Sequence, residues 1–188
     1  MSDPVATFNE WLEEARASGL EAPEAMTLAT ADGDGRPSAR MVLLKGADGR
    51  GFTFFSGYKS RKGRELAENP RAALVFYWRP LGRQVRVEGA VSRLSDEESD
   101  AYWATRPPRS RAAAAASRQS EPIASRDELE AEFERLLPGD EVPRPERWGG
   151  YVLEPDAIEL WQHRDDRLHE RVRYTRTRDG WQARLLAP

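Results

Sequence analysis

Short runs of β-forming residues, separated by turns rich in glycine and aspartate, constrain the fold of this chain more than any other feature of its sequence. Runs over 26–31, 37–45 and 51–56 are divided by Asp-Gly-Asp-Gly at 32–35 and by Gly-Ala-Asp-Gly at 46–49. Glycine and aspartate at such positions favour the tight turns of hairpins. We therefore expect these three runs to form an antiparallel meander.

Five further strands are predicted in the rest of the chain. Two of them, 72–79 and 84–94, join around Leu81-Gly82, and three follow Trp148-Gly149-Gly150, with the last hairpin turning at Arg178-Asp179-Gly180. Antiparallel strands with helices inserted between them are typical of a small barrel with flanking helices, not of a parallel sheet. The predicted fold class is thus mainly β with flanking α-helices (α+β).

Four helices are predicted from their capping residues. Asp3 precedes Pro4 and an apolar pattern of helical spacing that ends at Gly19, and Ser60 starts a short helix that Pro70 terminates. Ser95 with Glu98, and Ser125 with Glu128, have the spacing of capping boxes.

Composition narrows the class of protein. A length of 188 residues favours a single domain over 1–188, and 39% hydrophobic residues with six tryptophans predict a folded globule. The absence of cysteine excludes disulfides and thiolate metal sites, and two histidines argue against an imidazole metal centre, so we expect no metal. A net charge of −3 argues against a broad nucleic-acid surface. Because no signal peptide or membrane-length apolar run is present, we expect a cytoplasmic protein.

Two clusters of basic residues in the first third of the chain have the chemistry of anion sites. Ser60-Arg61-Lys62 begins a helix, where free N–H groups and the helix dipole already favour an anion. Arg40 and Lys45 lie on one predicted strand, and their odd separation places them on opposite faces. The alternative for the latter pair is a strand with solvated ends, since exposure is the default for charged residues.

Two later clusters are similar candidates. Tyr102 and Arg106 share one helix face and Ser110 follows, so they could hold a phosphate, although helical aromatics more often only pack. Arg167, His169 and Arg171 alternate along a predicted strand and require an anion or acidic neighbours among them. A salt-bridged surface strand is the alternative there, and His169 has the pKa range of an acid or base near neutral pH.

Eight short motifs, taken in order along the chain, resemble the pyridoxine/pyridoxamine 5'-phosphate oxidase family. They are Arg40-Met41-Val42-Leu43-Leu44-Lys45, Ser60-Arg61-Lys62-Gly63, Arg83-Gln84-Val85, Gln119-Ser120, Trp148-Gly149-Gly150, Trp161-Gln162, Arg167-Leu168-His169 and Arg184-Leu185-Leu186-Ala187-Pro188. The chain departs from the usual family pattern at His163, where glycine is common, and in the alanine run over 112–116.

The resemblance implies a flavin mononucleotide (FMN)-binding split β-barrel that forms a homodimer, with FMN in clefts between the subunits. It implies that the cofactor is bound by Arg40, Lys45, Phe55, Ser56, Arg61, Lys62, Gln84, Gln119, Ser120, Trp161 and Arg171, of which Gln119, Ser120, Trp161 and Arg171 come from the partner chain. It implies that the substrate is bound by Lys45, Tyr102, Arg106, Ser110, Arg167 and His169, of which Arg167 and His169 are the catalytic candidates.

The implied reaction is the oxidation of pyridoxine or pyridoxamine 5'-phosphate by oxygen to pyridoxal 5'-phosphate, with release of hydrogen peroxide and, from the amine, ammonia. The flavin performs the redox step and the protein supplies position and charge. Two alternatives remain: a related flavin oxidase acting on another small aromatic ring, as in phenazine biosynthesis, and a flavin- or pyridoxal phosphate-binding protein without turnover.

Overall fold

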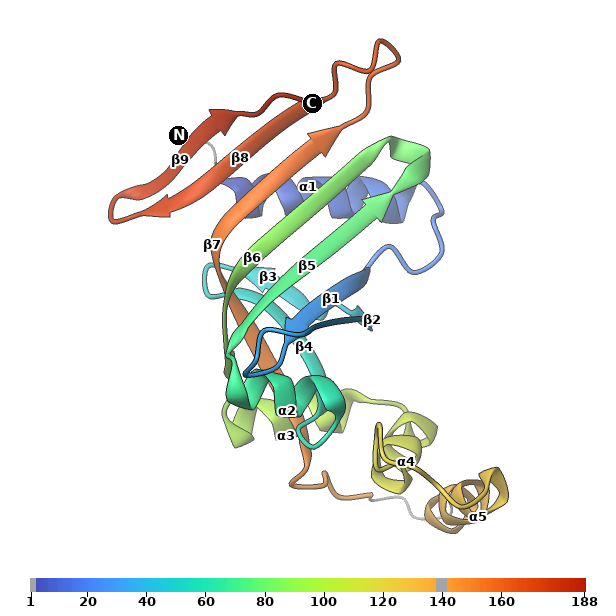
Figure 1. Ribbon diagram of the computed structural model, residues 1–188. Helices are drawn as coiled ribbons and strands as arrows, with labels where there is room; N and C mark the ends of the chain where they lie inside the picture. Colours follow the sequence, from blue (N-terminus) through green and yellow to red (C-terminus); the bar gives the residue numbers. More distant parts are fainter. Residues whose placement is uncertain (1–2, 138–141) are drawn as a thin grey trace.

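A computed structural model describes residues 3–137 and 142–188 of the chain. Within these residues one antiparallel sheet is flanked by helices (Figure 1). The elements are α1 (Pro4–Ala17), β1 (Ala25–Ala31), β2 (Pro37–Leu43), β3 (Gly46–Asp48), β4 (Gly51–Gly57), α2 (Arg61–Glu68), β5 (Arg71–Trp78), a 3-10 turn (Arg79–Leu81), β6 (Arg83–Arg93), α3 (Asp96–Thr105), α4 (Pro108–Ala116), α5 (Arg126–Leu136), β7 (Trp148–Gln162), β8 (Glu170–Thr177) and β9 (Gly180–Leu185). The predicted mainly β fold is confirmed.

The sheet runs in the order β2-β1-β5-β6-β7-β4-β3, and β8 and β9 continue from the far part of β7. The long strand β7 pairs with β4 near its start and with β8 near its end, while β6 accompanies most of its length. A bulge at Glu88/Gly89 bends this central pair. A Cβ on Gly89 would lie 1.9 Å from the Glu154 oxygen, so only glycine permits the bend.

The predicted meander is wrong. β1 and β2 form one hairpin and β3 and β4 another, but β1 pairs next with β5, and β4 pairs with β7. The expected turn over 46–49 also shifts, because Gly46–Asp48 is the short strand β3 and the chain reverses between Asp48 and Gly51. Gly51, with φ 138°, supplies the backbone conformation that this reversal requires.

The predicted helix starts are confirmed. Asp3 accepts a hydrogen bond from the Val5 N–H at 3.0 Å, and the Ser95–Glu98 capping box is complete in both directions. Ser125 accepts from the Glu128 N–H at 3.2 Å. Helix α4 was not predicted, although proline at its first position and its alanine run both favour a helix. In the described part of the chain, no helix has the length and apolar character of a membrane span.

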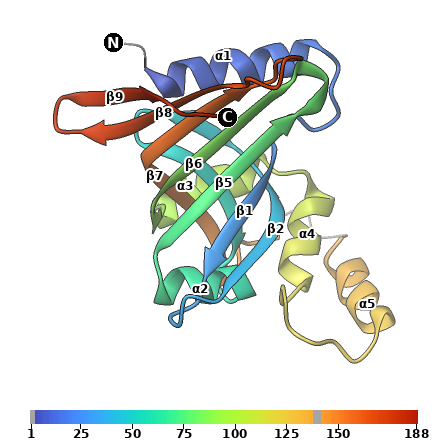
Figure 2. The ribbon, with the colours of Figure 1, turned by 45° about the horizontal axis from the view of Figure 1, so that its top comes forward.

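The main core lies between the curled sheet and α1, which crosses one end of the strands (Figure 2). Phe8 of α1 is fully buried, and its ring lies 4.9 Å from Phe52, 4.8 Å from Phe76 and 5.9 Å from Trp78. These rings come from α1, β4 and β5, so one side chain joins the opening helix to both arms of the sheet. Trp103 of α3 packs with Val142 and Trp148 in a second, smaller cluster.

Phe8→Ala should lower the free energy of unfolding by about 3–5 kcal/mol, because it removes a buried ring and leaves a cavity among the other aromatic rings. Urea unfolding of the flavin-free protein, followed by tryptophan fluorescence, measures this loss. The control is Glu10→Ala on the exposed face of α1, which should change stability by no more than about 0.5 kcal/mol. Similar stabilities for the two variants would contradict the role assigned to Phe8.

Candidate functional site

A cavity of about 690 Å³ lies between β2 and the helices α2, α3 and α4. It is lined by most of the site residues predicted from the first two thirds of the chain: Arg40, Lys45, Phe55, Ser56, Arg61, Lys62, Tyr102, Arg106, Ser110, Gln119 and Ser120. Arg40 and Lys45 therefore meet in one cavity. The prediction that they lie on opposite faces assumed one regular strand. Lys45 lies beyond Leu43, the last residue of β2, so strand alternation does not determine the direction of its side chain.

The first turn of α2 lies directly against the end of β4. Ser60 caps the helix, accepting from the Gly63 N–H at 3.3 Å and donating to the Gly57 carbonyl at 2.7 Å. A Cβ on Gly63 would lie 2.2 Å from the Tyr58 carbonyl oxygen. Only glycine allows this approach, which carries Lys62 into the protein interior.

Lys62 is the buried cation of the site. It is 5% exposed, and its Nζ donates to Ser56 Oγ at 2.8 Å, Ser60 Oγ at 3.0 Å and Gln119 Oε1 at 3.0 Å. Burial, together with the nearby charge of Arg40, lowers the pKa of Lys62 to about 8. Gln119 was expected to reach the cofactor from a partner chain, but here it binds Lys62 of its own chain.

Glu65, which the sequence analysis did not single out, lies behind the basic residues. Burial acts to raise the pKa of its carboxyl, but hydrogen bonds from Ser38, Thr30, Arg61 and Arg40 outweigh burial and hold the pKa at about 2. Its position four residues after Arg61 on one helix was the available sequence signal. Arg40 and Arg61 thus contact one carboxylate with Lys62 close by, and the excess positive charge suits the cavity to an anion.

Aromatic rings and Arg106 form the wall of the cavity near α3. Phe55 stacks on Tyr102 at 3.8 Å and on Trp148 at 5.5 Å, and the Arg106 guanidinium lies 4.6 Å from the Trp148 ring centroid. Arg106 also donates to the Ser110 carbonyl at 2.9 Å, and burial lowers its pKa. Tyr102 therefore both packs and lines the cavity, so the two interpretations of this residue are compatible.

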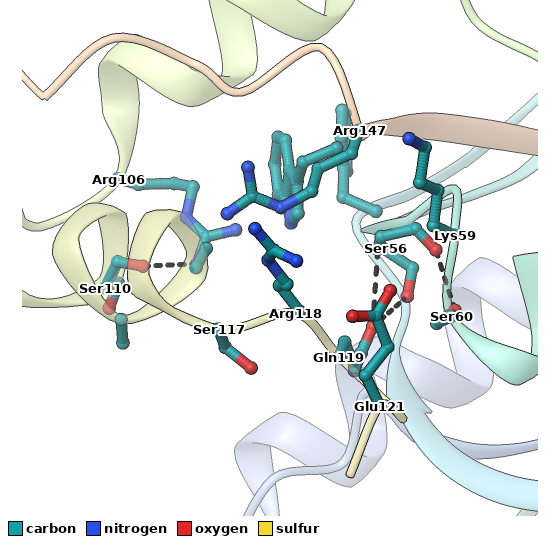
Figure 3. A pocket seen from close by; sticks show the side chains of 15 residues that line it. Ser56, Lys59, Ser60, Arg106, Ser110, Ser117, Arg118, Gln119, Glu121 and Arg147 are labelled. Atoms are coloured by element: carbon teal, nitrogen blue, oxygen red, sulfur yellow. Dashed lines mark hydrogen bonds between the residues drawn. The ribbon is translucent and has the colours of Figure 1, made fainter. Parts of the chain in front are cut away.

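A second cavity of about 420 Å³ adjoins the first. Gln119 lines both cavities, and Figure 3 shows its bond with Ser56. In the second cavity the side chains of Arg106, Arg118 and Arg147 point toward one another, with Glu121 nearby (Figure 3). The basic character of the site thus continues beyond Gln119.

The remaining predicted residues lie elsewhere in the molecule. Gln84 pairs with Trp161 across the sheet, Trp161 pairs with Arg171, and the His169 ring lies 4.7 Å from that of Trp161. They gather near the end of β7, whereas Trp148, at the start of β7, lines the second cavity. Figure 1 shows the two ends of this strand far apart. A strand of 15 residues extends over roughly 45 Å along its path. One chain therefore does not bring Arg167 and His169 to the cavity.

The prediction that Arg167, His169 and Arg171 alternate on one strand is wrong. β8 begins at Glu170, and Arg167 lies in a turn with φ 62°. Asp166 accepts from the Leu168 N–H at 3.0 Å, and His169 Nδ1 accepts from the Arg164 N–H at 3.1 Å. These local bonds hold the segment as a loop instead of a strand.

Arg171 alone of the three lies on β8. It donates to the buried carboxylate of Glu159 at 2.9 Å and to the Ala187 carbonyl at 2.9 Å, which fixes the end of the chain against the sheet. His163, beside this loop, brings its ring within 5.1 Å of the His169 ring. Among the described residues no group of three His, Cys, Asp or Glu is placed to hold a metal ion.

Comparison with known families gives one match over the residues around the cavity and a second match over the C-terminal strands. Residues 12–138 match the family described as pyridoxamine 5'-phosphate oxidase, and residues 148–188 match the pyridoxine 5'-phosphate oxidase C-terminal dimerisation region. The chain belongs to the pyridoxamine 5'-phosphate oxidase family. The resemblance inferred from the eight motifs is confirmed, and the family assignment supports an oxidoreductase with a flavin cofactor.

Similar proteins cover nearly the whole chain. Pyridoxine/pyridoxamine 5'-phosphate oxidases of Rubrobacter xylanophilus and Cupriavidus taiwanensis are 58% and 55% identical over 189 residues, covering 99% of this chain and 87% and 89% of theirs. The structure of PhzG from Burkholderia lata, in complex with tetrahydrophenazine-1-carboxylic acid, is 39% identical with a TM-score of 0.97, covering 100% of this chain and 94% of that one.

A more distant structure supports the fold. It is a pyridoxamine 5'-phosphate oxidase-related, FMN-binding protein from Nostoc punctiforme, 18% identical with a TM-score of 0.83, which covers 100% of this chain and 98% of its own. The predicted split-barrel fold is confirmed. Within the family, the cavity residues Arg40 to Ser120 fall in the oxidase region, and Trp161, Arg167, His169 and Arg171 fall in the dimerisation region.

Proposed function

We propose that this chain is an FMN-dependent oxidase that converts pyridoxine 5'-phosphate or pyridoxamine 5'-phosphate to pyridoxal 5'-phosphate, acting as a homodimer. The observation that carries the proposal is that two sets of side chains with the chemistry to bind phosphate line one cavity. Arg40, Arg61 and Lys62 form the first set, and Lys45, Arg106 and Ser110 belong to the second. A phosphorylated cofactor and a phosphorylated substrate require this pair of anion sites side by side.

The first set fits the phosphate of FMN. Lys62 is buried among neutral partners, and Arg40 and Arg61 add more positive charge than Glu65 neutralises. Phe55, Ser56, Gln119 and Ser120 would line the remainder of the flavin site. When bound, FMN supplies the redox chemistry, as acceptor of a hydride from the substrate's exocyclic carbon and as donor of electrons to oxygen.

The second set fits the substrate. Tyr102 and Ser110 would donate hydroxyl hydrogen bonds to its phosphate, and Lys45 and Arg106 would supply charge. Arg106 is already ordered by the Ser110 carbonyl and the Trp148 ring, so little conformational entropy is lost when it binds an anion. These residues orient the pyridine ring beside the cofactor, which is the main contribution that the protein makes to rate.

A second copy of the chain would complete the site. Trp161, Arg167, His169 and Arg171 do not line the cavity of their own chain, and the match of 148–188 to a dimerisation region supports delivery of these residues to a partner's cavity. Leu168, between the two catalytic candidates, is 66% exposed in the isolated chain. In the dimer, Arg167 and His169 would cover the pyridine ring and exclude water.

A phenazine-type substrate is the second candidate, because PhzG shares 39% identity and nearly the same structure. The two functions are separated by supplying the FMN-loaded protein in air with pyridoxine 5'-phosphate, pyridoxamine 5'-phosphate or a reduced phenazine carboxylic acid. We expect pyridoxal 5'-phosphate and peroxide in equal amounts from the first two. Turnover of the phenazine alone would favour the second candidate, and a yellow protein that oxidises none of them would favour a binding protein.

Mixing two defective variants tests the shared site. Lys62→Ala should weaken FMN binding, and Arg167→Ala should reduce turnover far more than FMN retention. If the two residues meet only across the dimer, refolding an equal mixture restores about a quarter of wild-type activity, because half the dimers are mixed and each has one intact site. Activity is measured by peroxide release at an FMN concentration that saturates the wild type but leaves Lys62→Ala largely unoccupied, with each variant refolded alone as control. A mixture no more active than its components would contradict the arrangement.

FMN affinity should fall as the pH rises through about 8, where Lys62 loses its proton. The lowered pKa means that the ammonium form predominates at pH 7 and is lost well before an ordinary lysine would lose it, whereas the phosphate is mostly a dianion over this range. Fluorescence titration between pH 7 and 9.5 measures the dissociation constant of FMN. Lys62→Arg should flatten the profile, since arginine stays charged. An equally steep profile in this variant would assign the titration to another group.

A further inference from the structure

The side chain of Glu65 lies behind the wall of the cavity. Its side chain is 7% exposed, and it is not among the residues that line the cavity, whereas Arg40 and Arg61 both are. Its carboxylate is enclosed by groups from three elements, β1, β2 and α2. A group in this position contacts the cations but not a molecule bound in front of them.

The hydrogen bonds of Glu65 leave part of each arginine available. Arg61 donates through Nε at 2.9 Å, and no described residue bonds its two terminal nitrogens. Arg40 donates through Nη2 to Glu65 at 3.1 Å and to Ser38 Oγ, and through Nη1 to the Leu28 carbonyl at 3.1 Å and to Thr30 Oγ1, so of its N–H groups the Nε–H alone has no partner among the described residues. The single hydroxyl hydrogen of Ser38 is shared between the two carboxylate oxygens, which lie 2.9 and 2.6 Å from Ser38 Oγ, and this contact helps to orient the carboxylate.

We propose that Glu65 is a positioning residue for the cofactor phosphate, which holds the Arg40 and Arg61 guanidinium groups from behind so that their remaining N–H groups face the cavity. The inference rests on the proposed function, because it takes FMN as the occupant. Arginines ordered before binding lose little side-chain entropy when the phosphate arrives. An amide in place of the carboxylate would present N–H donors to groups that are themselves donors.

The alternative hypothesis, that Glu65 serves only to neutralise charge, predicts the opposite change in FMN affinity. If Glu65 only neutralised charge, its removal would make the cavity more positive and FMN would bind more tightly. The charged groups that face Glu65 are Arg40 of β2 and Arg61 of α2, with Lys62 also near enough for the carboxylate to favour its ammonium form. Removing the carboxylate should therefore also move the fall in FMN affinity to lower pH.

The test compares FMN with riboflavin, which lacks the phosphate, on the flavin-free full-length protein by fluorescence titration. Glu65→Gln should weaken FMN on the order of tenfold or more, the loss typical of a charge-assisted hydrogen bond, and leave riboflavin within about twofold. Glu65→Asp should recover part of the FMN affinity. The matched control is Glu68→Gln on the same helix, where the carboxylate is exposed and, among the described residues, accepts a hydrogen bond from the Gly33 N–H alone; this variant should match wild type.

Three results would overturn the inference. FMN affinity that is unchanged or tighter in Glu65→Gln would show that the carboxylate does not position the arginines, and the proposed function would stand. Equal losses for FMN and riboflavin would indicate a general structural role. A wild-type protein that does not bind FMN would overturn both proposals. If Glu65→Gln does not fold, Glu65→Asp is compared in the same way, because it keeps the charge and moves it by one methylene. A loss of affinity for FMN but not for riboflavin would support the inference, and equal or absent losses would contradict it.

Discussion

The architecture of the site depends on two opposite charges that are buried on α2. Placing Lys62 and Glu65 out of water is unfavourable unless hydrogen bonds replace hydration, and here serine, threonine, glutamine and arginine groups supply them. Those partners come from β1, β2, β4 and the segment after α4. The close approach allowed by Gly63 holds them together, so the cavity exists only where α2 meets the end of β4.

The same sheet explains why one chain would carry two incomplete halves of the proposed site. β7 is paired along its whole length, with β4 near Trp148 and with β8 near Trp161, so its two ends cannot approach each other. The cavity lies at one end and the loop with Arg167 and His169 at the other. A rigid strand thus separates residues that the proposed chemistry requires together, and a two-fold dimer is the simplest arrangement that joins them.

Sequence reasoning succeeded where the signal was local. The caps at Asp3, Ser60, Ser95 and Ser125 each predicted a helix start, because a capping side chain bonds a backbone group only two or three residues away. It failed where two local signals competed. Alternating residues over 167–171 suggested a strand, but Asp166 and His169 bond nearby backbone N–H groups and form a loop.

By itself, the sequence determined the mainly β class, the helix starts, the family and most of the residues that line the cavity. Only the tertiary structure decided that β4 pairs with β7, that Glu65 lies between Arg40 and Arg61, and that His169 lies away from Lys62. The physical reason is the separation along the chain over which each interaction acts. Caps and turns act over a few residues, whereas strand order follows from burying apolar side chains such as Phe8, Phe52 and Phe76 in one core, which depends on the whole chain at once.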